Sequence, residues 1–189
     1  MYVFFSGEGA SDFGVCDMGV QHQYCMGDYY LPGPLTYIVD AMIEIKYKYS
    51  IIESNVAVFV DGAELERIKI QIKPSKKSIR LRGYNVPAET RFHFEDARSF
   101  AFAVSDFVAE KNENKFIAIL FRDSNTNDNK EWQNKRNSML SGFEVGFSKR
   151  QISNNGIPML PRPVSEAWLL CAIYRQENQN SNCEYLEEI

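Results

Sequence analysis

Cysteine and long apolar runs are both scarce in this sequence. The 189 residues include four cysteines, too few for a fold built on disulfides: Cys16, Cys25, Cys171 and Cys183. No apolar run approaches the ~20 residues that cross a bilayer, which predicts no membrane partner. The N-terminus has no basic stretch, and Glu8 interrupts its apolar run too early for a signal peptide. We therefore expect a cytoplasmic protein.

Three residues that commonly bind zinc lie close together in the sequence: Cys16, His22 and Cys25. Their spacing is not one of the standard zinc spacings, and no fourth ligand is evident. The sequence therefore favours ordinary reduced thiols in a loop over a structural zinc site.

The apolar fraction predicts a folded chain. Hydrophobic residues make up 44% of the sequence and aromatic residues 13%, which is typical of globular proteins rather than disordered ones. A chain of 189 residues is long enough to bury a core, and we expect a single domain over residues 1–189.

Positive charge is concentrated in one stretch, although the net charge is −4. Residues 67–91 contain one acid, Glu89, and eight basic residues: Arg67, Lys69, Lys73, Lys76, Lys77, Arg80, Arg82 and Arg91. Such a strip suggests an anionic partner, with nucleic acid the obvious candidate. The residues expected to bind it are Lys73, Lys76, Lys77, Arg80 and Arg82. A solvated β-hairpin that protects an edge strand with charge explains the pattern equally well.

Strand-like and helix-like segments alternate along the chain. Apolar runs predict strands at 2–5, 56–60, 116–121 and 157–160, and alternating apolar and basic residues predict half-exposed strands at 68–72 and 79–82. Apolar periodicity predicts helices at 34–46, 95–110, 131–147 and 165–176, with a loop from the first strand to Gly33 in which Ser11 caps a helix. The inward residues expected on the first two helices are Leu35, Ile38, Val39, Met42 and Ile43, then Phe100, Ala103, Val104 and Phe107. This order predicts an α/β fold with a mainly parallel sheet flanked by helices, to which residues 67–91 add a basic hairpin.

Acidic residues follow two of the predicted strands. The first strand ends in Ser-Gly-Glu-Gly-Ala-Ser-Asp, residues 6–12, which displays Glu8. The strand 116–121 ends in Arg-Asp-Ser-Asn-Thr-Asn-Asp, residues 122–128, and Glu166 begins a later helix. Oxygen ligands of this kind suit a hard cation, and no catalytic His/Cys pair accompanies them. The candidate metal ligands are Glu8, Asp123, Asn125, Asp128 and Glu166.

Each of these residues also has an ordinary structural explanation. Asp, Ser and Asn dominate polar turns, and a carboxylate at a helix start favours the helix dipole. These residues therefore indicate a site only as a group, and none of them does so alone.

The same residues resemble a known family. Glu8-Gly9 with Ser11-Asp12 after the first strand, and Asp123-Ser124-Asn125 after a later one, resemble the Toprim pattern of primases, type II and type IA topoisomerases and OLD-family nucleases. The segments 120–123 (LFRD), 138–143 (SMLSGF) and 157–170 (IPMLPRPVSEAWLL) are similar to a family of uncharacterised Toprim-like proteins. Members of that family are often encoded beside ABC-type or AAA-type ATPases in bacterial anti-phage loci.

The resemblance implies a Toprim-like, Rossmann-like fold, bound Mg²⁺ or Mn²⁺ and action on nucleic acid. Glu8 matches the Toprim glutamate, credited with general acid/base work, and Asp123 matches the first metal aspartate. Asn125 departs from the usual second aspartate, which weakens the attraction for a cation, and Asp128 or Glu166 would have to compensate.

Two classes of function follow. The first is a metal-dependent nuclease-like effector that works with a partner ATPase in anti-phage defence. The second is a non-catalytic Toprim-like subunit that binds an ATPase or senses nucleic acid. A phosphohydrolase of the haloacid dehalogenase kind is disfavoured, because that chemistry needs an aspartate where Asn125 stands.

Overall fold

A computed structural model describes residues 1–9, 12–17, 23–72, 88–162 and 164. The strands are β1 (Tyr2–Ser6), β2 (Gly14–Cys16), β3 (Tyr24–Met26), β4 (Tyr30–Pro32), β5 (Ala57–Val60), β6 (Phe116–Phe121) and β7 (Gly156–Met159). The α-helices are α1 (Pro34–Tyr47), α2 (Gly62–Ile72), α3 (Arg91–Lys111) and α4 (Asn129–Lys149), with short 3₁₀ helices η1 (Gly27–Tyr29) and η2 (Ala88–Thr90).

Five strands form the central sheet, in the order β3-β5-β1-β6-β7. β3 runs antiparallel to β5, and the other neighbours in this sheet are parallel. β2 and β4 form a separate antiparallel pair. The predicted α/β architecture with a mainly parallel sheet is confirmed, and no described helix is long and apolar enough to cross a membrane.

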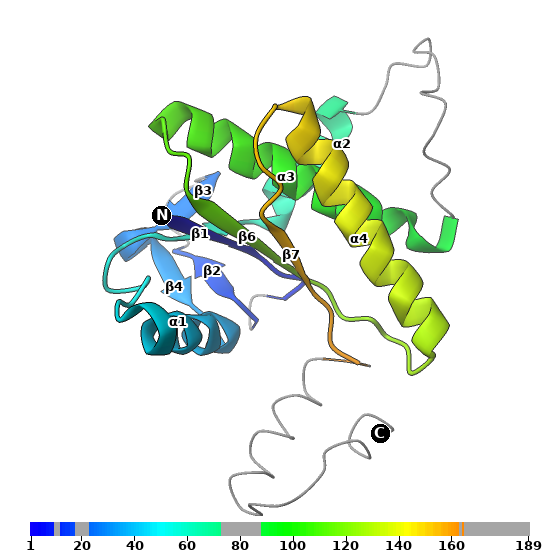
Figure 1. Ribbon diagram of the computed structural model, residues 1–189, viewed down its shortest axis with the longest axis horizontal. Helices are drawn as coiled ribbons and strands as arrows, with labels where there is room; N and C mark the ends of the chain where they lie inside the picture. The colour runs from blue at the N-terminus through cyan, green and yellow to red at the C-terminus, as the bar shows by residue number, and fades with distance from the viewer. Residues whose placement is uncertain (10–11, 18–22, 73–87, 163, 165–189) are drawn as a thin grey trace, which may run out of the picture.

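Helices cover both faces of the sheet because side chains alternate along each strand (Figure 1). Val3 and Phe5 of β1 join a buried cluster with Leu35 of α1. Phe4 belongs to a second cluster on the opposite face, which includes Val104 of α3 and residues of α2 and α4. β1 is therefore buried from both sides at the centre of the molecule.

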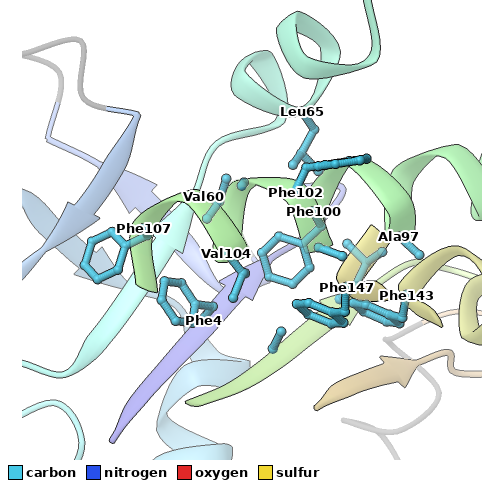
Figure 2. Close-up of a cluster of buried hydrophobic side chains, with 14 of the residues drawn as sticks. Phe4, Val60, Leu65, Ala97, Phe100, Phe102, Val104, Phe107, Phe143 and Phe147 are labelled. Carbon is cyan, nitrogen blue, oxygen red and sulfur yellow. The ribbon is translucent and has the colours of Figure 1, made fainter. Parts of the chain in front are cut away.

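Aromatic rings fill the layer between the sheet and α3 (Figure 2). Phe4 meets Phe107 edge to face, with the ring centroids 5.1 Å apart. Phe143 and Phe147 of α4 stack at 5.9 Å, and Phe100 lies against Phe143. The inward face predicted for α3 is confirmed, since its named residues are all buried: Phe100, Ala103, Val104 and Phe107.

The inward face predicted for α1 is only partly correct. Leu35, Val39 and Ile43 are buried, whereas Ile38 and Met42 are exposed. The buried residues are four positions apart, and residues at that spacing lie on one side of a helix. A single stripe of α1 therefore faces the sheet.

The strand predicted at residues 68–72 is wrong, because these residues form the end of α2. Asp61 directly precedes this helix, and its carboxylate accepts a hydrogen bond from the N–H of Ala63 at 2.8 Å. Leu65, Ile68 and Lys69 are buried at helical spacing, while Ile70 is 69% exposed. Over five positions, alternating apolar and basic residues fit a strand and a helix equally well. Here they continue a helix that starts directly after Asp61. The segment 79–82 lies outside the described residues, as do Lys73, Lys76, Lys77, Arg80 and Arg82.

The stretch predicted as a loop before Gly33 contains β2, β3, η1 and β4. The carbonyl of Phe13 anchors it, accepting hydrogen bonds from the hydroxyls of Tyr30 (2.5 Å) and Thr36 (2.7 Å) and from the N–H of Gly33 (2.8 Å).

The helix expected after Ser11 is absent from the described residues, where residues 14–16 are strand. The expected reduced thiols are also wrong, because Cys16 and Cys25 form a disulfide.

Candidate functional site

Glu8 and Asp123 occupy equivalent places on neighbouring strands. Glu8 is the second residue after β1, and Asp123 is the second residue after β6. The two strands are parallel partners, with Ser6 opposite Leu120 at their carboxyl ends. Both acidic residues therefore lie at the same edge of the sheet.

The charges at this second strand end act on the Glu8 carboxylate. The backbone N–H of Asp123 and the cation of Arg122 favour its charged form, whereas the carboxylates of Asp123 and Asp96 disfavour it. The loop beyond it is closed by Asp12, whose carboxylate accepts from the N–H of Gly9 at 3.0 Å. Glu8 is exposed, and Asp123 is half-buried.

The surroundings raise the pKa of the Glu8 carboxyl above its ordinary value. Partial burial is the largest cause, and the carboxylates of Asp123 and Asp96 act in the same direction. Arg122 and the Asp123 N–H oppose the shift by stabilising the charged form. A carboxyl of this kind exchanges a proton closer to neutral pH than an ordinary surface glutamate.

The edge between β1 and β6 is also where the chain changes direction across the sheet. The first α-helix after β1 is α1, which packs on one face, whereas α4 follows β6 and packs on the other (Figure 1). In open α/β sheets, ligands bind at the carboxyl ends of strands at such a switch point. Glu8 and Asp123 thus flank the place where the topology favours a ligand.

A buried ion network lies directly beneath this edge. The Arg122 Nε donates to Asp96 Oδ2 at 2.5 Å, and Arg122 Nη1 donates to the carbonyl of Phe121 at 2.7 Å. Lys69 of α2 pairs with the other oxygen of Asp96. Asp96 is 1% exposed, and the Lys69 and Arg122 cations lie 5.0 and 6.0 Å from the centre of the Phe92 ring.

Cations also fasten the loop that follows Asp123. Lys135 Nζ of α4 donates to the carbonyl of Ser124 at 2.7 Å. Arg162, which follows β7, donates to the carbonyl of Asn127 at 2.5 Å and to the side chain of Asn129. These contacts hold the loop from two directions.

The other sequence candidates are placed differently. Asp128 caps α4, and its carboxylate accepts from the N–H of Glu131 at 2.7 Å. Asn125 is exposed at the turn of the loop, with a φ of 49° that asparagine tolerates. Glu166 and His22 lie outside the described residues. Within the described part of the chain, no three His, Cys, Asp or Glu side chains gather closely enough to hold a metal ion.

Asp96, Arg122 and Lys69 were not among the residues expected at the site. The sequence contained one signal for them, because Asp96 lies on the same helical stripe as Phe100, Ala103 and Phe107. A carboxylate on an otherwise apolar inward stripe needs a buried cation, and Arg122 follows the most apolar strand of the chain.

The sequence matches no family model, and comparisons with curated proteins and with solved structures found no similar protein.

Proposed function

We propose that this chain is a metal-dependent nuclease-like effector whose reaction takes place between Glu8 and Asp123. The observation that supports the proposal is that these two acidic residues follow neighbouring parallel strands at the switch point of the sheet. The Toprim resemblance adds the expectation of a partner ATPase and of a role in anti-phage defence, and the cytoplasmic location expected from the sequence stays part of the proposal.

The donor set suits Mg²⁺ or Mn²⁺. Mg²⁺ in phosphoryl-transfer sites is held by one or two carboxylates and keeps several of its waters. Glu8 and Asp123 would supply these carboxylates, with Glu166 and Asn125 as further oxygen donors. When bound, the cation supplies charge stabilisation for cleavage of a phosphodiester.

The chain's own residues would position and transfer protons. Glu8, with its raised pKa, is suited to take a proton from an attacking water or to return one to the leaving oxygen. The N–H of Asp123 favours the charged form of that carboxylate, and the cations at Ser124 and Asn127 hold the loop in place. The basic residues from Lys73 to Arg82 would contact the phosphate backbone.

The test is cleavage of single- and double-stranded DNA and RNA with Mg²⁺, with Mn²⁺ and with excess chelator. Because general acid/base groups and metal ligands act on the chemical step, Glu8→Gln and Asp123→Asn should each lower the rate at least about 100-fold. Glu44→Gln, an exposed acid on α1, is the matched control and should cut at the unaltered rate. Cleavage that persists in chelator or in both variants would remove these residues from the mechanism.

A non-catalytic subunit is the second candidate. Two features reduce the attraction for a cation: Asn125 stands in place of an aspartate, and the positive charge of Arg122 acts on Glu8. Exposed apolar residues on α1 are of the kind found in protein interfaces: Tyr37, Ile38, Met42 and Ile45. A chain that neither cuts nucleic acid nor binds Mn²⁺, yet copurifies with a coexpressed partner ATPase, would favour this candidate.

A further inference from the structure

Phe92, in the first turn of α3, is a large apolar side chain that is 51% exposed beside the candidate site. The centre of its ring lies 6.0 Å from the guanidinium of Arg122, the residue between the end of β6 and Asp123. The ring is therefore at the carboxyl edge of the sheet, next to one of the two strand ends that carry the candidate acids. A ligand that reaches this edge can contact it.

Two buried cations hold the inner side of this ring. Lys69 Nζ lies 5.0 Å from the ring centre, and both this cation and Arg122 are within the distance at which an aromatic face attracts a cation. Lys69 and Arg122 bind the same carboxylate, that of Asp96, so they lie on the same side of the ring. All three charged side chains are buried. The ring thus covers this ion network with one side and leaves its other side to solvent.

A nucleobase is the occupant that fits a fixed, half-exposed ring of this kind. Every base has a π-face, and proteins commonly hold unpaired bases by stacking them on aromatic side chains. A ring that is already held in place loses little conformational freedom when a base stacks on it. The preceding residue, Arg91, is exposed and offers a positive charge to a neighbouring phosphate. Bases inside a duplex already stack on one another, so the ring favours a single strand.

We propose that Phe92 is a stacking site for one base of a single-stranded nucleic acid that enters the candidate site. The choice of nucleic acid as the ligand rests on the proposed function, whereas the fixed position of the ring does not. Because Arg122 contacts the ring and directly precedes Asp123, a base held there brings its backbone to the proposed reaction centre. The substrate class of that centre is then a single strand rather than an intact duplex.

The first experiment measures binding without cleavage. The probe is a fluorescein-labelled thymidine strand of about 15 nucleotides in excess chelator, and fluorescence anisotropy gives the dissociation constant. Phe92→Leu should weaken binding about tenfold, because leucine keeps an apolar cover over the ion network but has no ring on which a base can stack. Phe92→Trp should bind at least as tightly as the unaltered chain, since indole also stacks.

Tyr47 provides the matched control. It is 56% exposed and has Lys46 Nζ 5.2 Å from its ring centre, but it ends α1 on the other face of the sheet. Tyr47→Leu should therefore leave binding unchanged. A strand of the same length without bases is the second control. It should bind equally to the unaltered chain and to Phe92→Leu, because its phosphates remain and nothing stacks.

The Phe92→Trp variant reports the contact directly. A base stacked on the new indole should quench its fluorescence, and the strand without bases should not. The unaltered chain, which contains Trp132 and Trp168, supplies the background. Should Phe92→Leu not fold, this measurement decides, and an unquenched indole in the presence of saturating thymidine strand overturns the proposal.

Three other results would overturn the stacking site. The first is equal binding of the single strand by the unaltered chain and by a folded Phe92→Leu protein, and the second is no binding by the unaltered chain. The third is a Phe92→Leu protein that keeps the single strand but loses a coexpressed partner ATPase, because the ring would then be a protein contact.

Cleavage assays with Mg²⁺ and Mn²⁺ separate this inference from the proposed function. If the strand binds through Phe92 but is not cut with either metal, the proposed function fails and the stacking site stands. If metal-dependent cleavage occurs and Phe92→Leu binds and cuts like the unaltered chain, the stacking site fails and the proposed function stands.

Discussion

His93, in the first turn of α3, is a titratable side chain in a restrictive environment. It is buried, and neither ring nitrogen has a hydrogen-bond partner among the described residues. Burial is the main cause that lowers its pKa to about 4, with Lys135 and Arg122 acting in the same direction and Asp96 and Glu131 opposing them. The imidazole is therefore neutral in the folded protein at pH 7, whereas an unfolded histidine titrates near 6.5.

This difference predicts a loss of stability in mild acid. The unfolded chain takes up a proton at this side chain below about pH 6.5, and the folded chain does so only near pH 4, so the unfolding free energy falls through this window. At pH 5 the loss due to His93 should be about 2 kcal/mol relative to pH 7.5. Urea unfolding of His93→Leu should show a loss smaller by that amount. Parallel pH dependence in the two proteins would contradict the assigned pKa.

At the scale of elements, the contact between α3 and α4 depends on two glycines one turn apart. A Cβ at Gly142 would lie 2.4 Å from the carbonyl oxygen of Phe94, and one at Gly146 would lie 2.5 Å from Cβ of Ala101. The two helices therefore approach too closely for any side chain at these positions. Because Phe143 and Phe147 lie beside them, the same approach sets the packing of the aromatic layer.

A pair of alanine substitutions tests this close approach. Gly146→Ala should lower the unfolding free energy by about 1–3 kcal/mol, because a methyl group there forces the helices apart. Gly62→Ala at the start of α2 is the matched control. Its Cβ would meet nothing within 4 Å, and the better helix propensity of alanine should stabilise by up to about 1 kcal/mol. Thermal or urea unfolding measures both, and equal effects would contradict the packing argument.

At the scale of the whole molecule, one covalent link joins the two sheets. Cys16 lies in β2 of the two-stranded sheet, and Cys25 lies in β3 at the edge of the central sheet. Disulfides persist mainly in oxidising compartments, so this bond stands against the expected cytoplasmic location, which stays a prediction.

The link should contribute measurable stability. Closing a loop of this length restricts the unfolded chain by about 2–3 kcal/mol, and replacing both cysteines by alanine should lower the unfolding free energy by that amount. A thiol reductant should destabilise the unaltered chain to the same extent and leave the double variant unchanged. If reductant shifts the unfolding of both proteins equally, the disulfide is not the cause.

Much of the fold follows from local patterns in the sequence. The central strands were predictable because strands buried on both faces are nearly continuous apolar runs, as in residues 116–121. α3 and α4 were predictable because their apolar residues recur at helical spacing. The residues 68–72 were not, because alternating apolar and basic residues satisfy a strand and a helix equally over so short a segment.

The candidate site was likewise predictable only in part. Sequence alone determined that Glu8 and Asp123 each follow an apolar strand, since strand ends and the polar residues after them are local features. Only the tertiary structure decided that β1 and β6 are neighbours, that Arg122 points at Asp96, and that Cys16 meets Cys25. These are contacts between residues far apart in the chain or in different sheets, and their energies depend on burial and distance. No local pattern encodes either quantity, and the folded arrangement alone sets them.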